Sequence, residues 1–150
     1  MGIDIDPNAK AHSDLNVHVE IGNQSDTNFL DMLLNKYGIP DIVIDDGSHI
    51  QKDILITFQK IYPLMHKNGI YLVEDLHTAY WPKYGGGLKK DGTFIEFTKD
   101  CLDKLNAYHS RGTVEPDHIT TNTFGIHIYD SVVVFEKGII PSRISIKKGK

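Results

Sequence analysis

The sequence is poor in the features that mark several classes of protein. Its single cysteine, Cys101, excludes an internal disulfide and makes a reducing, cytoplasmic setting the expected one. A membrane-spanning helix needs roughly 20 apolar residues in succession. No run of that kind is present, so we expect no signal peptide and no membrane partner. No long block of charge of either sign is present, and the basic stretch at residues 147–150 is too short to predict nucleic-acid binding.

What remains is the composition of an ordinary globular protein. The chain has 150 residues, of which 40% are hydrophobic and 24% are charged, and its formal net charge is -4. This length and balance predict one domain over residues 1–150.

Along the chain, apolar residues change between the spacing of strands and the spacing of helices. Strands are predicted at residues 2–6, 17–21, 41–44 and 70–73, with a hairpin at 126–129 and 132–135. Helices are predicted from Ser25 or Asp26 to Gly38, from Ile50 to Met65 with a kink or end at Pro63, and from Thr93 to Tyr108, with Cys101 in its core face. Residues 76–92 show neither spacing, which predicts a long loop of the kind that often closes over a site. The order of elements predicts an α/β fold, with a mostly parallel sheet and one antiparallel edge strand.

Acidic residues end two of the predicted strands. Asp45 and Asp46 end one of them, and Glu74 and Asp75 end the next. An α/β protein places its chemistry at such strand ends, and neighbouring carboxylates repel unless a cation or a shared proton holds them. Oxygen ligands suit a hard cation such as Mg²⁺, so Asp46, Glu74 and Asp75 are candidate metal ligands. The alternative is that each acid caps the helix after its strand.

A histidine follows each acidic pair. His49 lies at the predicted start of a helix, where the helix dipole disfavours the imidazolium and keeps the ring neutral, as a general base requires. The alternative for His49 is an ordinary residue at a helix N-terminus that hydrogen-bonds to the backbone. For His77 the sequence predicts a role in orienting a neighbouring group.

Ring side chains and glycines then gather in one short segment. His77, Tyr80, Trp81 and Tyr84 precede three consecutive glycines at 85–87. Aromatic faces stack on a sugar or another ring, and the glycines could act as hinges of a lid, which predicts a small-molecule acceptor site. A subunit interface, where tyrosine and tryptophan are also enriched, is an equal alternative.

Four motifs occur in an order and spacing that resemble a known family. They are Gly2-Ile3-Asp4-Ile5-Asp6-Pro7, Ile21-Gly22-Asn23-Gln24-Ser25-Asp26, Asp41-Ile42-Val43-Ile44-Asp45-Asp46-Gly47-Ser48-His49, and Glu74-Asp75-Leu76-His77-Thr78 with Tyr80-Trp81. Together they resemble the class I S-adenosylmethionine-dependent methyltransferases of the macrocin and mycinamicin sugar O-methyltransferase type, which act in antibiotic biosynthesis. The cephalosporin hydroxylase family is similar. The resemblance implies a Rossmann-like sheet with a C-terminal antiparallel hairpin, and methyl transfer from S-adenosylmethionine to a sugar hydroxyl.

The resemblance also implies roles for individual residues. It implies a Mg²⁺ site on Asp46, Glu74 and Asp75, with His49 as the general base. It further implies that Asp4 binds the cofactor ribose. The residues implied for the adenine and methionine side of the cofactor pocket are Gln24, Ser25, Asp26 and Asp45.

One part of the family pattern is missing from this sequence. The family has a central strand and a glycine-rich loop before the segment that matches residues 2–7, and here only Met1 precedes that segment. We therefore expect an N-terminally truncated catalytic domain whose sheet is split and has exposed edges. Exposed edges favour association, so a homo-oligomer is also expected.

Two other functions stay open at this point. One is a catalytically inactive remnant, or a subunit that needs a partner chain. The other is a cephalosporin-hydroxylase-like enzyme that uses iron, although a non-haem iron site needs two histidines with one carboxylate.

Overall fold

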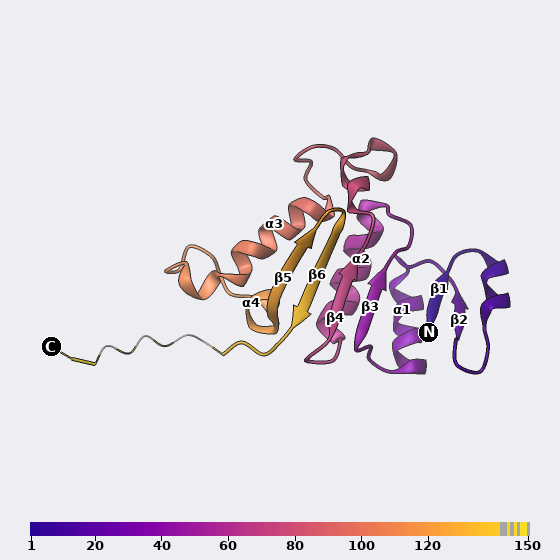
Figure 1. Cartoon of the computed structure of the whole chain (residues 1–150), viewed down its shortest axis with the longest axis horizontal. Coiled ribbons are helices and arrows are strands. Elements are labelled where there is room, and N and C mark those ends of the chain that lie inside the picture. Colours follow the sequence, from indigo (N-terminus) through magenta and orange to yellow (C-terminus); the bar gives the residue numbers. More distant parts are fainter. Residues whose placement is uncertain (142–143, 145, 147, 150) are drawn as a thin grey trace.

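The computed structural model describes residues 1–141, 144, 146 and 148–149 (Figure 1). Lys147 and Lys150 of the basic C-terminus lie outside the described residues. No helix in the described part of the chain is both long enough and apolar enough to span a membrane.

Strands and helices alternate along most of the chain. The strands are β1 Gly2–Asp4, β2 Val19–Ile21, β3 Ile42–Asp45, β4 Ile70–Val73, β5 Thr123–Tyr129 and β6 Val132–Lys137. The α-helices are α1 Thr27–Tyr37, α2 Gln51–Ile61, α3 Phe94–Leu105 and α4 His118–Asn122. Short 3-10 turns lie at η1 Pro7–His12, η2 Tyr62–Leu64, η3 Leu76–Tyr80, η4 Pro82–Tyr84 and η5 Ala107–His109. The predicted strands, helices and hairpin are thus confirmed, whereas α4 and the 3-10 turns were not predicted.

The strands form two separate sheets, in agreement with the split sheet that the sequence predicts. One has the order β1-β2 and the other β3-β4-β6-β5, and within the described residues no ladder joins them (Figure 1). β1 pairs with β2 in parallel, and β3 pairs with β4 in parallel. β6 is antiparallel to both β4 and β5, so it lies inside the sheet and β5 forms the edge. The prediction that the antiparallel strand lies at the edge was therefore wrong, because β6 and not β5 is the partner of β4.

Local sequence signals explain where the longer helices begin and end. The Asp26 carboxylate accepts hydrogen bonds from the backbone N–H groups of Asn28 and Phe29, which caps α1. Gly38, at φ 85°, ends that helix in a conformation that a residue with a Cβ rarely adopts. Thr93 caps α3 by accepting from the backbone N–H of Glu96.

One face of the four-stranded sheet is covered by helices and forms the core. Tyr71 and Val73 of β4 and Val133 and Phe135 of β6 are buried there, in one cluster with Phe58 of α2. Other members of the cluster come from the remaining helices, including Leu30, Leu33, Phe94 and Cys101. Burial raises the pKa of the Cys101 thiol to about 12, as expected for a core cysteine.

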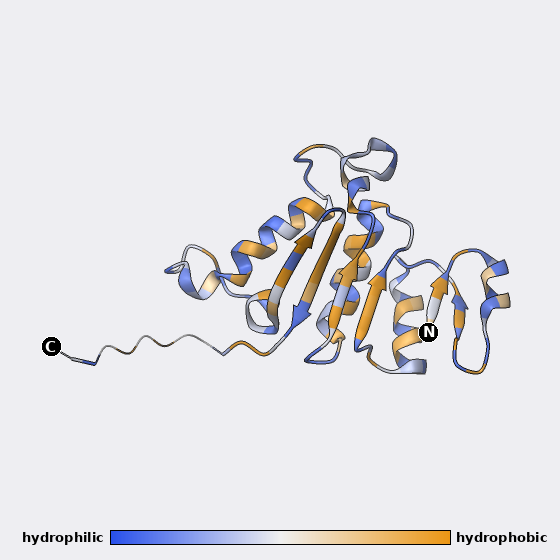
Figure 2. Ribbon diagram, in the orientation of Figure 1, coloured by the Kyte–Doolittle hydropathy of each residue, from blue (hydrophilic) through white to orange (hydrophobic). Residues whose placement is uncertain are grey.

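The opposite face of the same sheet is apolar and open. Ile42 and Ile44 of β3 are 65% and 62% exposed, and Ile70 of β4 is opposite Ile42 in the register. Figure 2 shows these strands as hydrophobic. Strands in parallel pairs are ordinarily covered on both faces, so this bare face is unusual.

The segment after β4 is more ordered than its sequence predicts. It contains η3 and η4, and the backbone N–H groups of Gly86 and Gly87 donate to the carbonyls of Trp81 and Ala79. A Cβ on Gly86 would lie only 2.4 Å from the Ala79 carbonyl oxygen, so glycine allows close packing of two backbone segments here. The segment was predicted as a structureless loop because 3-10 turns are too short to produce a regular spacing of apolar residues in the sequence.

Candidate metal site

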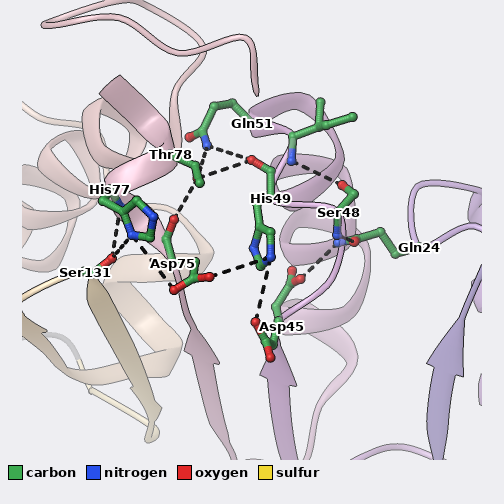
Figure 3. A network of polar contacts seen from close by, with 11 residues as sticks. Gln24, Asp45, Ser48, His49, Gln51, Asp75, His77, Thr78 and Ser131 are labelled. Carbon is green, nitrogen blue, oxygen red and sulfur yellow. Dashed lines mark hydrogen bonds and ion pairs between the residues drawn. The ribbon is translucent and has the colours of Figure 1, made fainter. Parts of the chain in front are cut away.

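Parallel pairing of β3 and β4 brings the two acidic strand ends together. Asp45 is in register with Val73, so the residues that follow each of them come out at the same edge of the sheet. There the Nε2 atom of His49 lies 3.9 Å from Asp46 Oδ1 and 3.8 Å from Asp75 Oδ2 (Figure 3). One ligand atom from each of Asp46, His49 and Asp75 lies within 4.8 Å of the other two. The sequence predicted that these side chains converge, and they do.

Two of the three residues have an unusual backbone conformation. His49 has φ 56° and Asp75 has φ 52°, in the left-handed region that residues with a Cβ seldom occupy. His49 precedes Ile50, the N-cap of α2, and therefore lies outside the helix. The prediction that His49 begins the helix was wrong, since the chain turns through this left-handed residue first. The helix dipole acts mainly within the first turn of a helix, so it affects His49 less than the sequence predicts.

Glu74 is not part of this three-residue group. It lies between Val73 and Asp75, is partly buried, and donates its backbone N–H to the Asp45 carbonyl. Its assignment as a third ligand stays a prediction.

Asp45, the neighbour of Asp46, is buried in a separate network. Its carboxylate accepts hydrogen bonds from Gln24 Nε2 at 2.9 Å and from the Tyr71 hydroxyl at 2.9 Å. Burial raises the pKa of Asp45, and burial together with that carboxylate raises the pKa of Tyr71. Gln24 also accepts from the backbone N–H of Ser48 at 2.6 Å, so this network holds the loop between β3 and α2 (Figure 3).

The other residues assigned to the cofactor side lie at the ends of the first two strands. Asp4 is exposed at the end of β1 and accepts a hydrogen bond from the backbone N–H of Asp6. Ser25 donates to the Asn23 side chain, and Asp26 is the cap of α1. These contacts lie within the protein, and cofactor binding by these residues stays a prediction.

Aromatic rings lie next to the three-residue group. His77 contacts Trp81 edge to face with ring centroids 4.8 Å apart, and Tyr84 contacts His49 edge to face at 6.3 Å. Trp81 and Tyr84 are 6.0 Å apart, so the rings form a continuous series beside the acids. A cavity of about 240 Å³ adjoins this series, and His77 and Tyr80 belong to its lining.

Three further residues organise the site and were not found from the sequence. Ser131 Oγ lies 2.7 Å from Nδ1 of His77 and also accepts from the His77 backbone N–H. Gln51 and Thr78 are buried between the segments that contain His49 and Asp75. A signal for Gln51 existed, because it is a polar residue at the apolar spacing of Ile54, Phe58 and Ile61.

The donor set fits a divalent cation. Two carboxylates provide hard oxygen ligands, and their side chains are 58% and 52% exposed, so water and a substrate oxygen can reach the same point. His49 is less exposed, at 23%, and its Nε2 atom faces both acids. The group can therefore hold a metal ion and place an imidazole beside it.

Comparison with known proteins identifies relatives of this chain. No protein-family model matches it. The mycinamicin VI 2''-O-methyltransferase of Micromonospora griseorubida is 36% identical over 135 residues, which cover 86% of this chain and 34% of the relative. The demethylmacrocin O-methyltransferase of Streptomyces fradiae is 34% identical over 143 residues, covering 92% of this chain and 36% of the relative. The chain thus spans about a third of the length of these curated relatives.

A solved structure shows the same fold. The MycE methyltransferase from the mycinamycin biosynthetic pathway, in complex with Mg, SAH and mycinamycin VI, matches with a TM-score of 0.84 at 33% identity. The match covers 97% of this chain and 39% of that one. A complex of MycE with Mg and SAH matches with a TM-score of 0.83. The chain is therefore a homologue of the macrocin- and mycinamicin-type sugar O-methyltransferases, and it has the Rossmann-like α/β fold of the region that it matches.

Proposed function

We propose that this chain contributes the metal and acceptor site of a Mg²⁺-dependent, S-adenosylmethionine-dependent O-methyltransferase. The observation that supports the proposal most directly is the convergence of Asp46, His49 and Asp75 at one edge of the sheet. The relatives add a second line of support, because their printed names are O-methyltransferases and the solved neighbour is a complex with Mg and SAH.

Each residue of the site has a distinct proposed role. Asp46 and Asp75 hold Mg²⁺, with Glu74 as the proposed third ligand. When bound, Mg²⁺ would orient the acceptor hydroxyl and lower its pKa. His49 takes the hydroxyl proton at Nε2, which faces both carboxylates from less than 4 Å. When bound, S-adenosylmethionine would supply the methyl group to the hydroxyl oxygen and would leave as S-adenosylhomocysteine.

The acceptor is a small molecule, and we propose a sugar hydroxyl. Trp81, Tyr84 and His77 provide ring faces beside the metal site, with Tyr80 at the neighbouring cavity. Such faces stack well on the apolar side of a sugar ring. The mycinamycin VI complex of the neighbour supports an acceptor of this class.

The cofactor site is proposed on Asp4, Gln24, Ser25, Asp26 and Asp45, and several of these groups already bond within the protein. This leaves an inactive or partner-dependent protein as the second candidate function.

A homo-oligomer and a cytoplasmic setting are further proposals. The first is based on the open edges of the sheets, and the second on the lone buried cysteine.

Calorimetric titration of the purified chain with Mg²⁺ tests the proposal. Wild-type protein should bind Mg²⁺, and Asp46→Asn and Asp75→Asn should each weaken binding at least tenfold, at about 1.4 kcal/mol per factor of ten. Asp41→Asn is a matched control, because Asp41 lies before the start of β3 and also pairs with a histidine, His66, at 3.7 Å. Equal binding by all four proteins would reject the assigned ligands.

Titration with S-adenosylmethionine then separates the candidate functions. Binding of both ligands supports the transferase, whereas Mg²⁺ binding without cofactor binding supports the partner-dependent protein. Iron-dependent oxygen uptake would favour the hydroxylase-like alternative. If an active enzyme that contains this chain keeps full turnover after the substitution His49→Ala, His49 is not the general base.

A further inference from the structure

His49 and Asp75 both occupy the left-handed backbone region, and neither is glycine. Such conformations persist only where the surrounding structure holds them, because each costs free energy relative to an ordinary backbone. The two residues come from different segments, one before α2 and the other after β4. A shared contact that holds both backbones would therefore fix the relative position of their side chains.

Gln51 and Thr78 form that contact. Gln51 Nε2 donates to the His49 carbonyl at 3.1 Å and to Thr78 Oγ1 at 3.3 Å (Figure 3). Thr78 Oγ1 in turn donates to the Asp75 carbonyl at 2.7 Å. A chain of side-chain hydrogen bonds thus joins the carbonyl groups of the two left-handed residues.

The chain of bonds is anchored in the core. Gln51 and Thr78 are only 1% and 2% exposed. Gln51 Oε1 accepts from the backbone N–H of Phe94, the first residue of α3, at 2.9 Å. Both ends of the Gln51 amide are therefore paired, and losing either pair would leave buried polar groups unsatisfied.

We propose that Gln51 and Thr78 are positioning residues, which hold His49 and Asp75 in the left-handed conformation that brings their side chains to one point. The hydrogen bonds of these two side chains go to backbone groups and to each other, and none goes to a side-chain ligand atom of Asp46, His49 or Asp75. The expected effect on metal binding rests on the proposed function, whereas the expected effect on the backbone conformation of His49 and Asp75 does not. Partners of metal ligands commonly change metal affinity by about 10–100-fold when they are removed.

Two substitutions with matched controls test this inference. Gln51→Met keeps the length of the side chain and removes its hydrogen bonds, and Gln59→Met makes the same change at an exposed position of α2. Thr78→Val removes the bridging hydroxyl, whereas the matched variant Thr78→Ser keeps it. The backbone NMR chemical shifts of His49 and Asp75 report the left-handed conformation, and Mn²⁺ titration of the full chain reports the site.

Gln51→Met and Thr78→Val should move the shifts of both His49 and Asp75 and weaken Mn²⁺ binding about tenfold. Gln59→Met and Thr78→Ser should leave both measurements near wild type. If the shifts of His49 and Asp75 are unchanged in Thr78→Val, the inference is wrong, and this comparison decides it even where Gln51→Met does not fold. If the wild-type chain does not bind Mn²⁺, the proposed metal site fails, and the shifts alone decide the positioning role.

Discussion

Asp45 and Asp46 are neighbours in the sequence with opposite environments. Asp45 is buried between Gln24 and Tyr71, whereas Asp46 is exposed and faces His49. The change of side between successive residues at a strand end explains the difference. One acid therefore stabilises the loop after β3 while the next is free to meet a ligand.

The sequence was sufficient to predict which residue types meet at this edge, because buried strands followed by acids have a clear pattern. It was not sufficient to predict the left-handed backbone of His49 and Asp75. That conformation depends on contacts with Gln51 and Thr78, which lie 27 residues apart in the chain. Local patterns contain no information on such distant contacts.

Glu20 of β2 should make stability depend on acid pH. Hydrogen bonds from Lys36 and Tyr37 lower the pKa of this carboxyl from its ordinary value of 4.5 to about 2. Because the folded state holds the charged form, its contribution is complete above pH 4.5 and is lost as the pH falls towards 2. Urea unfolding of wild type at pH 6, 4 and 2.5 should show this decline, and Glu20→Gln should flatten it. The exposed Glu115→Gln serves as the control, and the same slope in both variants would contradict the assignment.

At the scale of elements, Lys137 of β6 caps the C-terminal end of α2 and the 3-10 turn η2 that follows it. Its Nζ is buried and donates to the carbonyls of Tyr62, Pro63 and Met65 at 2.8, 3.2 and 3.1 Å. These carbonyls belong to η2 and the residue after it, where a helix end leaves acceptors without partners. A positive charge at this end also complements the helix dipole.

Lys137→Met should therefore destabilise the fold. Three carbonyls would lose their donor, two of them in buried hydrogen bonds, at a cost of about 1–3 kcal/mol. Urea unfolding followed by circular dichroism measures the change in the free energy of unfolding. Lys67→Met, an exposed substitution in the connection to β4, should have little effect. A loss in Lys137→Met no larger than in this control would show that the capping bonds contribute nothing.

Most elements were predictable because their periods and caps are local. Asp26, Gly38 and Thr93 mark the helix ends that the structure confirms. The position of β6 inside the sheet was not predictable, because it depends on which strand pairs with β4. The 3-10 turns after β4 were missed for a different reason, since they are too short to show a period.

At the scale of the whole molecule, the open apolar face of the four-stranded sheet favours association with another chain. Ile42, Ile44 and Ile70 expose apolar surface that is ordinarily covered, and such patches favour association. The expected homo-oligomer would cover part of this face.

Ile44→Lys tests this consequence. The side chain of Ile44 is 62% exposed, so its replacement should change the free energy of unfolding by only about 0.5 kcal/mol. Light scattering after size exclusion should show association of the wild-type protein that increases with concentration, and less association of the variant. Identical masses for both proteins over the same concentrations would rule out this face as the surface of association.

The central claim is that Asp46 and Asp75 hold a divalent metal ion beside the imidazole of His49. Stepwise addition of Mn²⁺ to the ¹⁵N-labelled chain tests it directly, because a bound paramagnetic ion broadens the amide signals around it. We expect the signals of residues 45–50 and 74–78 to broaden first, and Mg²⁺ to reverse the effect by competition. Broadening that begins elsewhere, or that Asp46→Asn leaves unchanged, would contradict the account.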